Sequence, residues 1–298
     1  MNGAEPNVML AETLVFGSGP ECPSELLCLP LLHARYGLTF KEFRVTDAGG
    51  PRTVDALETG AIQVGVLFTT DPRLLAGDFV LLEDDRHAQP AESVTPILRD
   101  ELRVTYGARL AATIDAVNAE LTTERLAELN RRVLLGSSPA AAAAEFLSER
   151  GHGRAPLVSR IDRPAIVLGS ANFAESVTVA ELYARALEGA GFPVERRLGI
   201  GNRDKYFPLL RDGAVGLVPE YVGSLLAYLD GGRAGISDPH QAHAVLADAL
   251  QKTGLVALQP ARAENKNGIV VTAATAARYG LRRVSDLGQA IESADGSG

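Results

Sequence analysis

The chain has 298 residues, 46% of them hydrophobic, and a formal net charge of -8. It is long enough for one large core or two smaller ones, and its negative charge excludes nucleic acid as an expected partner, because that class of protein needs a basic surface. No window approaches the ~18 uninterrupted apolar residues of a membrane span. The residues after Met1, NGAEPN, have neither the charged nor the apolar region of an export signal. We therefore expect a soluble chain.

Short apolar segments alternate with amphipathic segments along the chain. Strands are predicted at residues 13–17, 61–68, 165–173, 214–218, 255–260 and 268–272. Helices are predicted at residues 121–135, 139–151 and 175–191, and the last of these ends in a glycine-containing cap region. This alternation is typical of α/β proteins with a mostly parallel sheet.

An internal resemblance links residues 36–68 with residues 190–221. Each stretch has an extended segment, a glycine-containing turn with an arginine, an amphipathic helix that ends in Gly-Ala, and an apolar strand. We interpret them as related β-α-β units in two similar lobes, although unrelated α/β segments would share much of the pattern. If two lobes face each other, the strand ends at residues 68–71 and 218–221 point into the cleft between them.

Polar side chains follow the strand that is predicted to end near residue 68. The run is Phe68, Thr69, Thr70 and Asp71. Hydroxyl and carboxyl groups at a strand end suit a small polar ligand. Asp71 before Pro72 is also the pattern of a helix N-cap followed by proline, which needs no ligand. The cap explains the aspartate but leaves the two threonines as ligand candidates.

The stretch GSANFAES, residues 169–176, places Ser170 and Asn172 just before a predicted helix with Glu175 in its first turn. Backbone N–H groups at a helix start can hold an anion or a ligand oxygen. Ordinary capping by Ser170 or Asn172 is the alternative. The glycine-rich stretches at 17–22 and 199–204 lack the third glycine of a dinucleotide-binding loop.

The stretch GLVPEYVGS, residues 216–224, begins as an apolar strand and then changes character. Proline cannot donate to a strand ladder, so the strand is predicted to stop at Pro219 and to expose Glu220 and Tyr221. Ser224 follows after a glycine. Because ligands of α/β proteins bind at strand ends, we predict that this stretch forms one wall of a site.

Other reactive residue types give little sign of chemistry. Cys22 and Cys28 are either a short-loop disulfide of an oxidising compartment or two unrelated buried thiols. His240 and His243 are spaced as a metal pair would be, but no further histidine lies near them, so no metal is expected. The acidic run 83–85 is typical of a solvated turn. No nucleophile has a visible base, so we predict no catalytic residue and no cofactor.

Longer stretches identify a family. They include GSANFAESVTVAELYARALEGAG, LLRDGAVGLVPEYVGSLLAYL, LQPARAENKNGIVVT, GSGPECP and VLFTTDPRLLAGDFVLLEDD. With the segments between them, they resemble the substrate-binding proteins of ABC importers for glycine betaine, choline and related osmoprotectants over nearly the whole chain. The resemblance implies an α/β fold: a two-lobed, periplasmic-binding-protein-like clamp of type II. Each lobe would be a mixed, mostly parallel sheet flanked by helices.

The order of these stretches differs from the family's order. Residues 1 to about 160 resemble the family's later half and residues 164–298 its earlier half, so the chain resembles a circular permutant. Its ends would lie in a loop between residues 284–287 and 13–17, and residues 152–162 would join the former termini.

By the same resemblance, one lobe is continuous, at residues 90–261, and the second is formed by residues 1–89 and 262–298, with the ligand cleft between them. The residues expected to contact the ligand lie at strand ends and helix starts of both lobes. They are Ser18, Phe68, Thr69, Thr70, Asp71, Ser170, Asn172, Phe173, Glu175, Ser176, Glu220, Tyr221, Ser224 and Asn267.

Departures from the family pattern bear on the ligand. Family members that bind quaternary ammonium ions hold them over aromatic faces, each of which attracts a cation by about 0.5–2 kcal/mol. Where they commonly read D-[IL]-Y-P-E-Y-T-G-T, this chain has Gly216 for the acid and Val218 for a tyrosine. The remaining cage of Tyr221, Phe68 and Phe173 is predicted to be poorer than usual. An uncharged ligand with hydroxyl groups is expected to suit the serines and threonines at least as well.

The resulting prediction is a non-catalytic solute-binding protein of an ABC importer, which captures an osmoprotectant-like or other polar small molecule by lobe closure. By resemblance it is monomeric, works outside the cytoplasm as a cell-envelope lipoprotein, and delivers its ligand to a membrane permease. Two alternatives are a transferase or lyase that uses Glu175, Asp71 or Glu220 as acid–base groups, and a sensor domain whose closure a protein partner detects.

Overall fold

The computed structural model describes residues 8–151, 161–231 and 235–291, which form two compact units. Unit 1 contains the described residues up to Gln89 and from Lys266 onward, and unit 2 runs from Pro90 to Asn265. The chain passes from unit 1 to unit 2 after Gln89 and returns to unit 1 after Asn265, whereas the sequence predicted a return after residue 261. Most of the predicted joining segment 152–162 lies outside the described residues. In the part of the chain that is described, no helix has the length and apolar character needed to span a membrane.

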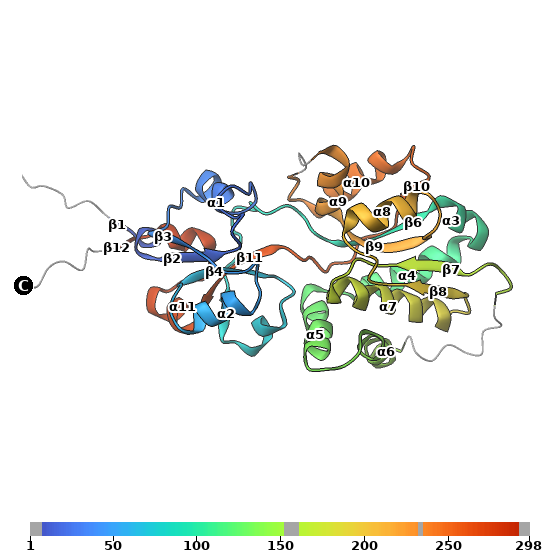
Figure 1. The fold of residues 1–298 in the computed structure, drawn as a ribbon, viewed down its shortest axis with the longest axis horizontal. Coiled ribbons are helices and arrows are strands. Elements are labelled where there is room, and N and C mark those ends of the chain that lie inside the picture. The colour runs from blue at the N-terminus through green and yellow to red at the C-terminus, as the bar shows by residue number, and fades with distance from the viewer. Residues whose placement is uncertain (1–7, 152–160, 232–234, 292–298) are drawn as a thin grey trace, which may run out of the picture. The chain divides into compact units, whose positions relative to one another are not determined.

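Unit 1 is built on a five-stranded sheet with the order β3-β2-β4-β11-β5 (Figure 1). Its strands are β2 (Val15–Ser18), β3 (Glu42–Val45), β4 (Val64–Phe68), β5 (Phe79–Leu81) and β11 (Asn267–Thr272). Its helices are α1 (Leu29–Tyr36), α2 (Pro51–Glu58) and α11 (Ala273–Tyr279), with 3-10 turns η1 (Leu10–Thr13), η2 (Pro72–Ala76) and η3 (Val284–Gly288). The Asp47 carboxylate accepts from three backbone N–H groups at the start of α2, which fixes where that helix begins.

Unit 2 is built on a five-stranded sheet with the order β8-β7-β9-β6-β10. Its strands are β6 (Val94–Arg99), β7 (Ile166–Gly169), β8 (Val194–Arg197), β9 (Leu217–Tyr221) and β10 (Leu255–Ala257). Its helices are α3 (Asp100–Tyr106), α4 (Ala108–Glu120), α5 (Thr123–Leu134), α6 (Pro139–Glu149), α7 (Ala174–Gly189), α8 (Arg203–Arg211), α9 (Val222–Asp230) and α10 (Pro239–Leu250).

The two sheets have the same plan. In each, three neighbouring strands are parallel, and one strand, β11 in unit 1 and β6 in unit 2, is antiparallel to both of its neighbours. That strand is the first one after the chain has passed from the other unit, so it enters its sheet against the direction of the rest. The predicted mixed sheets are confirmed, and four of the five strands of each run the same way.

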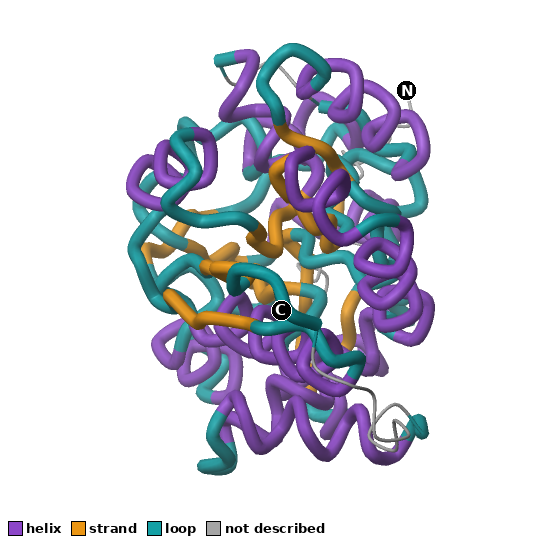
Figure 2. The backbone as a smooth tube through the Cα atoms, turned by 90° about the vertical axis from the view of Figure 1, so that its right-hand side faces the viewer, coloured by secondary structure: helices purple, strands orange, loops and turns teal. Residues whose placement is uncertain are grey.

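Each sheet is covered by helices on both faces (Figures 1 and 2). In unit 2, Leu168 and Leu217 pack with α4–α7 in one core, while Ile97 and Val218 pack with α8–α10 in another. Helix α7 is buried along most of its length because the sheet, α4, α5 and α6 all contact it. The strands and helices predicted from apolar periodicity are therefore present, with ends that differ by a few residues.

The ends of the described chain lie side by side. Short strands β1 (Val8–Met9) and β12 (Ala290–Ile291) pair antiparallel, with Val8 opposite Ile291. If these ends were joined, β11 would precede β2 along the chain of unit 1. The corresponding strands of unit 2 have the same order, because β6 precedes β7. The pairing supports the rearranged chain order that the family resemblance implies, which stays a prediction.

The predicted end of β9 was wrong. The strand continues through Pro219 to Tyr221, and both Glu220 and Tyr221 are buried instead of exposed. Pro219 lies opposite Pro96 of β6. Because neither proline has a backbone N–H, no donor is left unpaired between them and the strand can continue. The alternatives left open for the cysteines are also resolved, because Cys22 and Cys28 form a disulfide.

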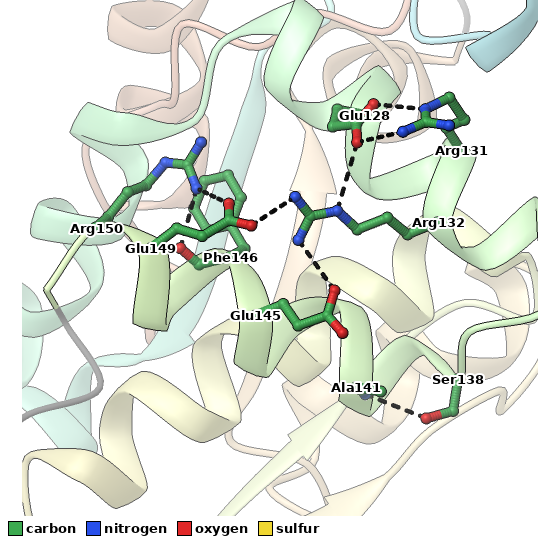
Figure 3. Close-up of polar contacts among 9 residues, drawn as sticks. All are labelled: Glu128, Arg131, Arg132, Ser138, Ala141, Glu145, Phe146, Glu149 and Arg150. Carbon is green, nitrogen blue, oxygen red and sulfur yellow. Dashed lines mark hydrogen bonds and ion pairs between the residues drawn. The ribbon is translucent and has the colours of Figure 1, made fainter.

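Charged side chains join α5 to α6 on the surface of unit 2. Figure 3 shows Arg132 of α5 between Glu128 of its own helix and two glutamates of α6, Glu145 and Glu149. Its neighbour Arg131 reaches only Glu128 among the charged groups drawn. Arg132 is also the less exposed of the two, with 19% of its side chain accessible against 45%. Arg132 therefore links the two helices, whereas Arg131 does not.

We expect Arg132→Met to lower the free energy of unfolding by about 1 kcal/mol, because three carboxylates lose a shared partner. Arg131→Met is the matched control and should have a smaller effect. Urea unfolding at low and high salt measures both. Equal effects of the two substitutions, or an Arg132 effect that salt does not reduce, would contradict the linking role.

Candidate ligand-binding site

The carboxylate of Glu175 is the centre of a polar cluster in unit 2. Glu175 lies in the first turn of α7, just beyond the end of β7, and is 7% exposed. Its Oε1 accepts from the hydroxyl of Tyr221 at 2.5 Å and from Nδ2 of Asn265 at 2.7 Å. Its Oε2 accepts from Nδ2 of Asn130 at 2.5 Å. Strand β9, helix α5 and the segment before β11 thus each supply one donor.

None of these three donors is charged. Among the described residues, no arginine or lysine forms an ion pair with Glu175. The two other acids that the sequence singled out differ in this respect, because Glu220 pairs with Arg203 and Asp71 pairs with Arg73. Neutral hydrogen bonds stabilise an ionised carboxylate but leave its charge uncompensated. The cluster therefore presents a negative charge without a protein counter-ion.

An aromatic pair adjoins this carboxylate. The rings of Phe173 and Tyr221 are 6.1 Å apart between centroids and tilted by 33°. Phe173 is 44% exposed, whereas Tyr221 is 8% exposed. Burial and the charge of Glu175 raise the pKa of Tyr221 well above its usual value, so the hydroxyl stays protonated and keeps donating to the carboxylate. The pair offers ring surface beside a buried negative charge.

Glu220 has a different environment. It is fully buried, and its carboxylate accepts two hydrogen bonds of 2.9 Å from Arg203 and one of 2.7 Å from Tyr206, both on α8. The backbone N–H of Tyr221 also donates to it. A bidentate arginine and two further donors occupy its lone pairs, so Glu220 holds the start of α8 against β9.

The departures at Gly216 and Val218 lie away from the aromatic pair. Alternate residues of a strand point to opposite faces of the sheet. Val218 is fully buried with α8, α9 and α10, while Tyr221 packs with α4–α7. A Cβ on Gly216 would meet the Leu102 side chain at 2.8 Å. Val218 therefore packs on the opposite face of the strand from Tyr221, and the effect of these two positions on the aromatic cage stays a prediction.

The first passage between units is anchored at the start of α9. Glu92 accepts from the backbone N–H of Ser224 at 3.1 Å and from its hydroxyl at 2.9 Å. A Cβ on Gly223 would lie 2.4 Å from the Ala91 carbonyl oxygen, so only glycine allows this approach. The second passage is bound alongside, because the N–H of Asn265 donates to the Glu92 carbonyl. Gly223 and Ser224 thus hold the segment that connects the units.

The sequence profile of one family matches residues 25–149 and 164–297, and thus most of the chain. It describes the substrate-binding domain of ABC-type glycine betaine transport systems. The chain belongs to this family. Its fold is accordingly the α/β, type II periplasmic-binding-protein-like fold, and the family is one of binding domains rather than enzymes. A comparison with curated proteins gave no match.

Solved structures also resemble the chain. The periplasmic aliphatic sulphonate-binding protein SsuA of Escherichia coli is 13% identical, with a TM-score of 0.39, and the match covers 90% of this chain but only 64% of SsuA. Apo YehZ of Escherichia coli is 12% identical, with a TM-score of 0.38 and coverage of 90% and 83%. The periplasmic VFT2 domain of Bordetella pertussis BvgS is 9% identical, with a TM-score of 0.39 and coverage of 93% and 86%. At these values the three structures bear on no argument about the ligand.

The loop between β7 and α7 is held by its own serines. The Ser170 hydroxyl accepts from the N–H of Gly199, and the Ser176 hydroxyl accepts from the N–H of Ala171. The capping alternative was wrong, since the N-cap of α7 is Phe173, which makes no side-chain cap hydrogen bond. Asn172 is exposed. The serines therefore shape the loop that presents Glu175 and Phe173.

The remaining candidates lie in unit 1. Phe68, 41% exposed, ends β4 and lies opposite Asn267 of β11. Thr69 accepts from the N–H of Lys266, while Thr70 is buried. Asp71 caps η2 and pairs with Arg73, so the capping alternative is confirmed for it. Ser18 ends β2 and is 5% exposed. These residues share one end of the unit 1 sheet.

Sequence reasoning missed Asn130, Asn265, Arg203 and Glu92. Asn265 was within reach, because it lies in the family stretch AENKN beside the predicted Asn267. The other three come from helices and loops with no local signal of their own. The described residues contain no group of histidine, cysteine, aspartate and glutamate that is suited to hold a metal, and His243 instead contacts the Leu258 carbonyl.

Glu92 should give the protein a pH-dependent stability. Burial raises its pKa to about 7, with repulsion from Glu220 adding to the effect and the Ser224 hydrogen bonds and Arg203 opposing it. Between its ordinary pKa and 7, the folded state holds a proton that the unfolded state has lost. The free energy of unfolding should therefore fall as pH rises from 4.5 to 7.

We expect Glu92→Gln to remove this slope and to raise stability at pH 8 by about 1–3 kcal/mol, because glutamine keeps an acceptor for Ser224 without the buried charge. Denaturant unfolding between pH 5 and 8 measures this. Glu101→Gln is the control, since the pKa of this exposed acid is lowered by Arg99 and it titrates below that range. A slope unchanged in Glu92→Gln would exclude Glu92 as its source.

Proposed function

We propose that the protein is the solute-binding component of an ABC importer and that its ligand is a small organic cation. One observation supports the cation: the buried Glu175 carboxylate has three neutral donors and no positively charged partner among the described residues. A bound cation supplies the missing charge. This differs from the hydroxylated neutral ligand that the sequence favoured at least equally.

The aromatic pair supports the same ligand class. A cation over the face of Phe173 is attracted by the ring quadrupole. The Tyr221 hydroxyl donates to a carboxylate, which leaves more electron density on its ring than a free phenol has. The Glu175 charge, at the hydroxyl end of the Tyr221 ring, adds a Coulomb attraction that is strong because the group is buried. Ring face and charge together select a compact cation over a neutral molecule of the same shape.

Capture by closure of the two units completes the proposal. Phe68, Thr69, Asn267 and Ser18 gather at one end of the unit 1 sheet and would contact the ligand from the second side. Closure is then favoured by contacts that exist only when both units bind the ligand. The partner would be a membrane permease, and the place of action outside the cytoplasm, where the Cys22–Cys28 disulfide is stable. Lipid anchoring and a monomeric state remain predictions.

Choline and 3,3-dimethylbutan-1-ol test the ligand class. The two molecules have the same shape, but choline has a positively charged nitrogen where the alcohol has a neutral carbon. Calorimetric titration should show binding of choline at least a hundredfold tighter than of the alcohol. Glu175→Gln should weaken choline binding about tenfold by removing the charge. Glu128→Gln, a change to a partly exposed acid on α5 that pairs with Arg131 and Arg132, should have no effect on choline binding. A cationic ligand would be contradicted if the two compounds bound equally well, or if the protein bound sorbitol and not choline.

Closure has its own test. Small-angle X-ray scattering should show a smaller radius of gyration when choline saturates the protein, as expected if the ligand is held between the units. Phe68→Ala should weaken binding and leave the free protein's scattering unchanged. Binding of choline with no compaction and full tolerance of Phe68→Ala would place the ligand on unit 2 alone.

A further inference from the structure

One buried acceptor in the cluster around Glu175 is left without a partner. Among the described residues, the buried side-chain atoms that lack a hydrogen-bond partner are Asp115 Oδ1, Arg150 Nε, Arg185 Nε and Asn265 Oδ1. Of these, Asn265 belongs to the candidate site, since its Nδ2 donates to Glu175. A buried acceptor without a donor lowers the stability of the folded protein, so a ligand that donates a hydrogen bond to it gains binding free energy.

The orientation of this amide is fixed by chemistry. A carboxylate oxygen accepts hydrogen bonds and does not donate them, so the amide nitrogen of Asn265 must be the atom 2.7 Å from Glu175 Oε1. Exchange of nitrogen and oxygen would place two acceptors against each other. The backbone N–H of Asn265 is already used by the Glu92 carbonyl. The Oδ1 atom therefore faces away from the carboxylate, with its acceptor capacity unused by the protein.

We propose that Asn265 is a specificity-determining residue that accepts a hydrogen bond from a hydroxyl or N–H group of the ligand. The inference rests on the proposed function and narrows it, from small organic cations to those with a donor group close to the charged centre. Glu175 attracts the charge, and Asn265, bound to the same carboxylate, selects the donor. A cation that lacks a donor leaves the amide oxygen unsatisfied and binds less tightly.

The position of Asn265 in the chain also connects ligand binding to the segment that joins the two units. It is the last residue of unit 2, and the next residue, Lys266, donates its N–H to Thr69 of unit 1. A hydrogen bond from the ligand to Asn265 therefore acts on the segment that connects the units. The matched position on the other oxygen of Glu175 is Asn130, which lies on α5 and far in sequence from either passage. Both asparagines support the carboxylate, so a comparison of the two isolates the contribution of the Asn265 Oδ1 atom to ligand selection.

Choline and 2-chloroethyl-trimethylammonium test the inference, since both carry the same cation and only choline has a hydroxyl donor. Wild-type protein should bind choline about tenfold more tightly by calorimetric titration. Asn265→Leu should reduce this preference to near unity, because it weakens both cations by removing a donor to Glu175 and weakens choline further by removing the Oδ1 acceptor. Asn130→Leu is the control: it should weaken both cations and keep the preference. If Asn265→Leu does not fold, Asn265→Ala serves the same comparison.

The outcomes are distinguishable. Equal binding of both cations to the wild type, or a preference that survives Asn265→Leu, overturns the role of Asn265 and leaves the cationic ligand intact. Failure of both cations to bind overturns the proposed function and the inference with it. A preference that is lost in Asn130→Leu as well assigns selection to the carboxylate rather than to the amide of Asn265.

Discussion

The buried carboxylate of Glu175 is the interaction on which the rest of unit 2 depends. Its donors come from β9, α5 and the last residue before the chain leaves the unit, so the carboxylate ties together segments that are far apart in sequence. A charge of this kind is costly to bury unless its lone pairs are satisfied. Here the hydrogen bonds are satisfied and no charged protein group balances the carboxylate, and the proposal of a cationic ligand rests on this difference from a structural ion pair.

The corner between β9 and α9 organises the surroundings of that carboxylate. Three residues at this corner have separate partners: Glu220 holds α8 through Arg203, Tyr221 donates to Glu175, and Ser224 of α9 donates to Glu92 of the first passage. Gly223 is required because the Ala91 carbonyl approaches it too closely for any Cβ. This stretch is thus mostly a framework, in which one tyrosine contacts the Glu175 carboxylate and its neighbours fix the connecting segments.

The fold could be predicted to a large extent from the chain alone, because apolar periodicity is local. Strand β4 and helix α7 were found within a few residues, and so was the repeat that relates β3-α2-β4 to β8-α8-β9. The site was predicted in part. Glu175, Phe173 and Tyr221 carry local signals at strand ends and helix starts. Asn130 carries none, because a solvent-facing asparagine and one that points at a carboxylate look alike in an amphipathic helix.

The sequence by itself determined the class of fold, the family and the strand ends where polar residues gather, since these follow from periodicity and from contiguous motifs. Tertiary structure decided which acid is neutralised. Glu220 and Glu175 are equally plausible ligand groups along the chain, but strand alternation points Glu220 at Arg203 on one side of the sheet, and the β7–α7 loop points Glu175 at three neutral donors. The physical reason is that charge compensation depends on distances between residues remote in sequence, and only the folded chain sets those distances.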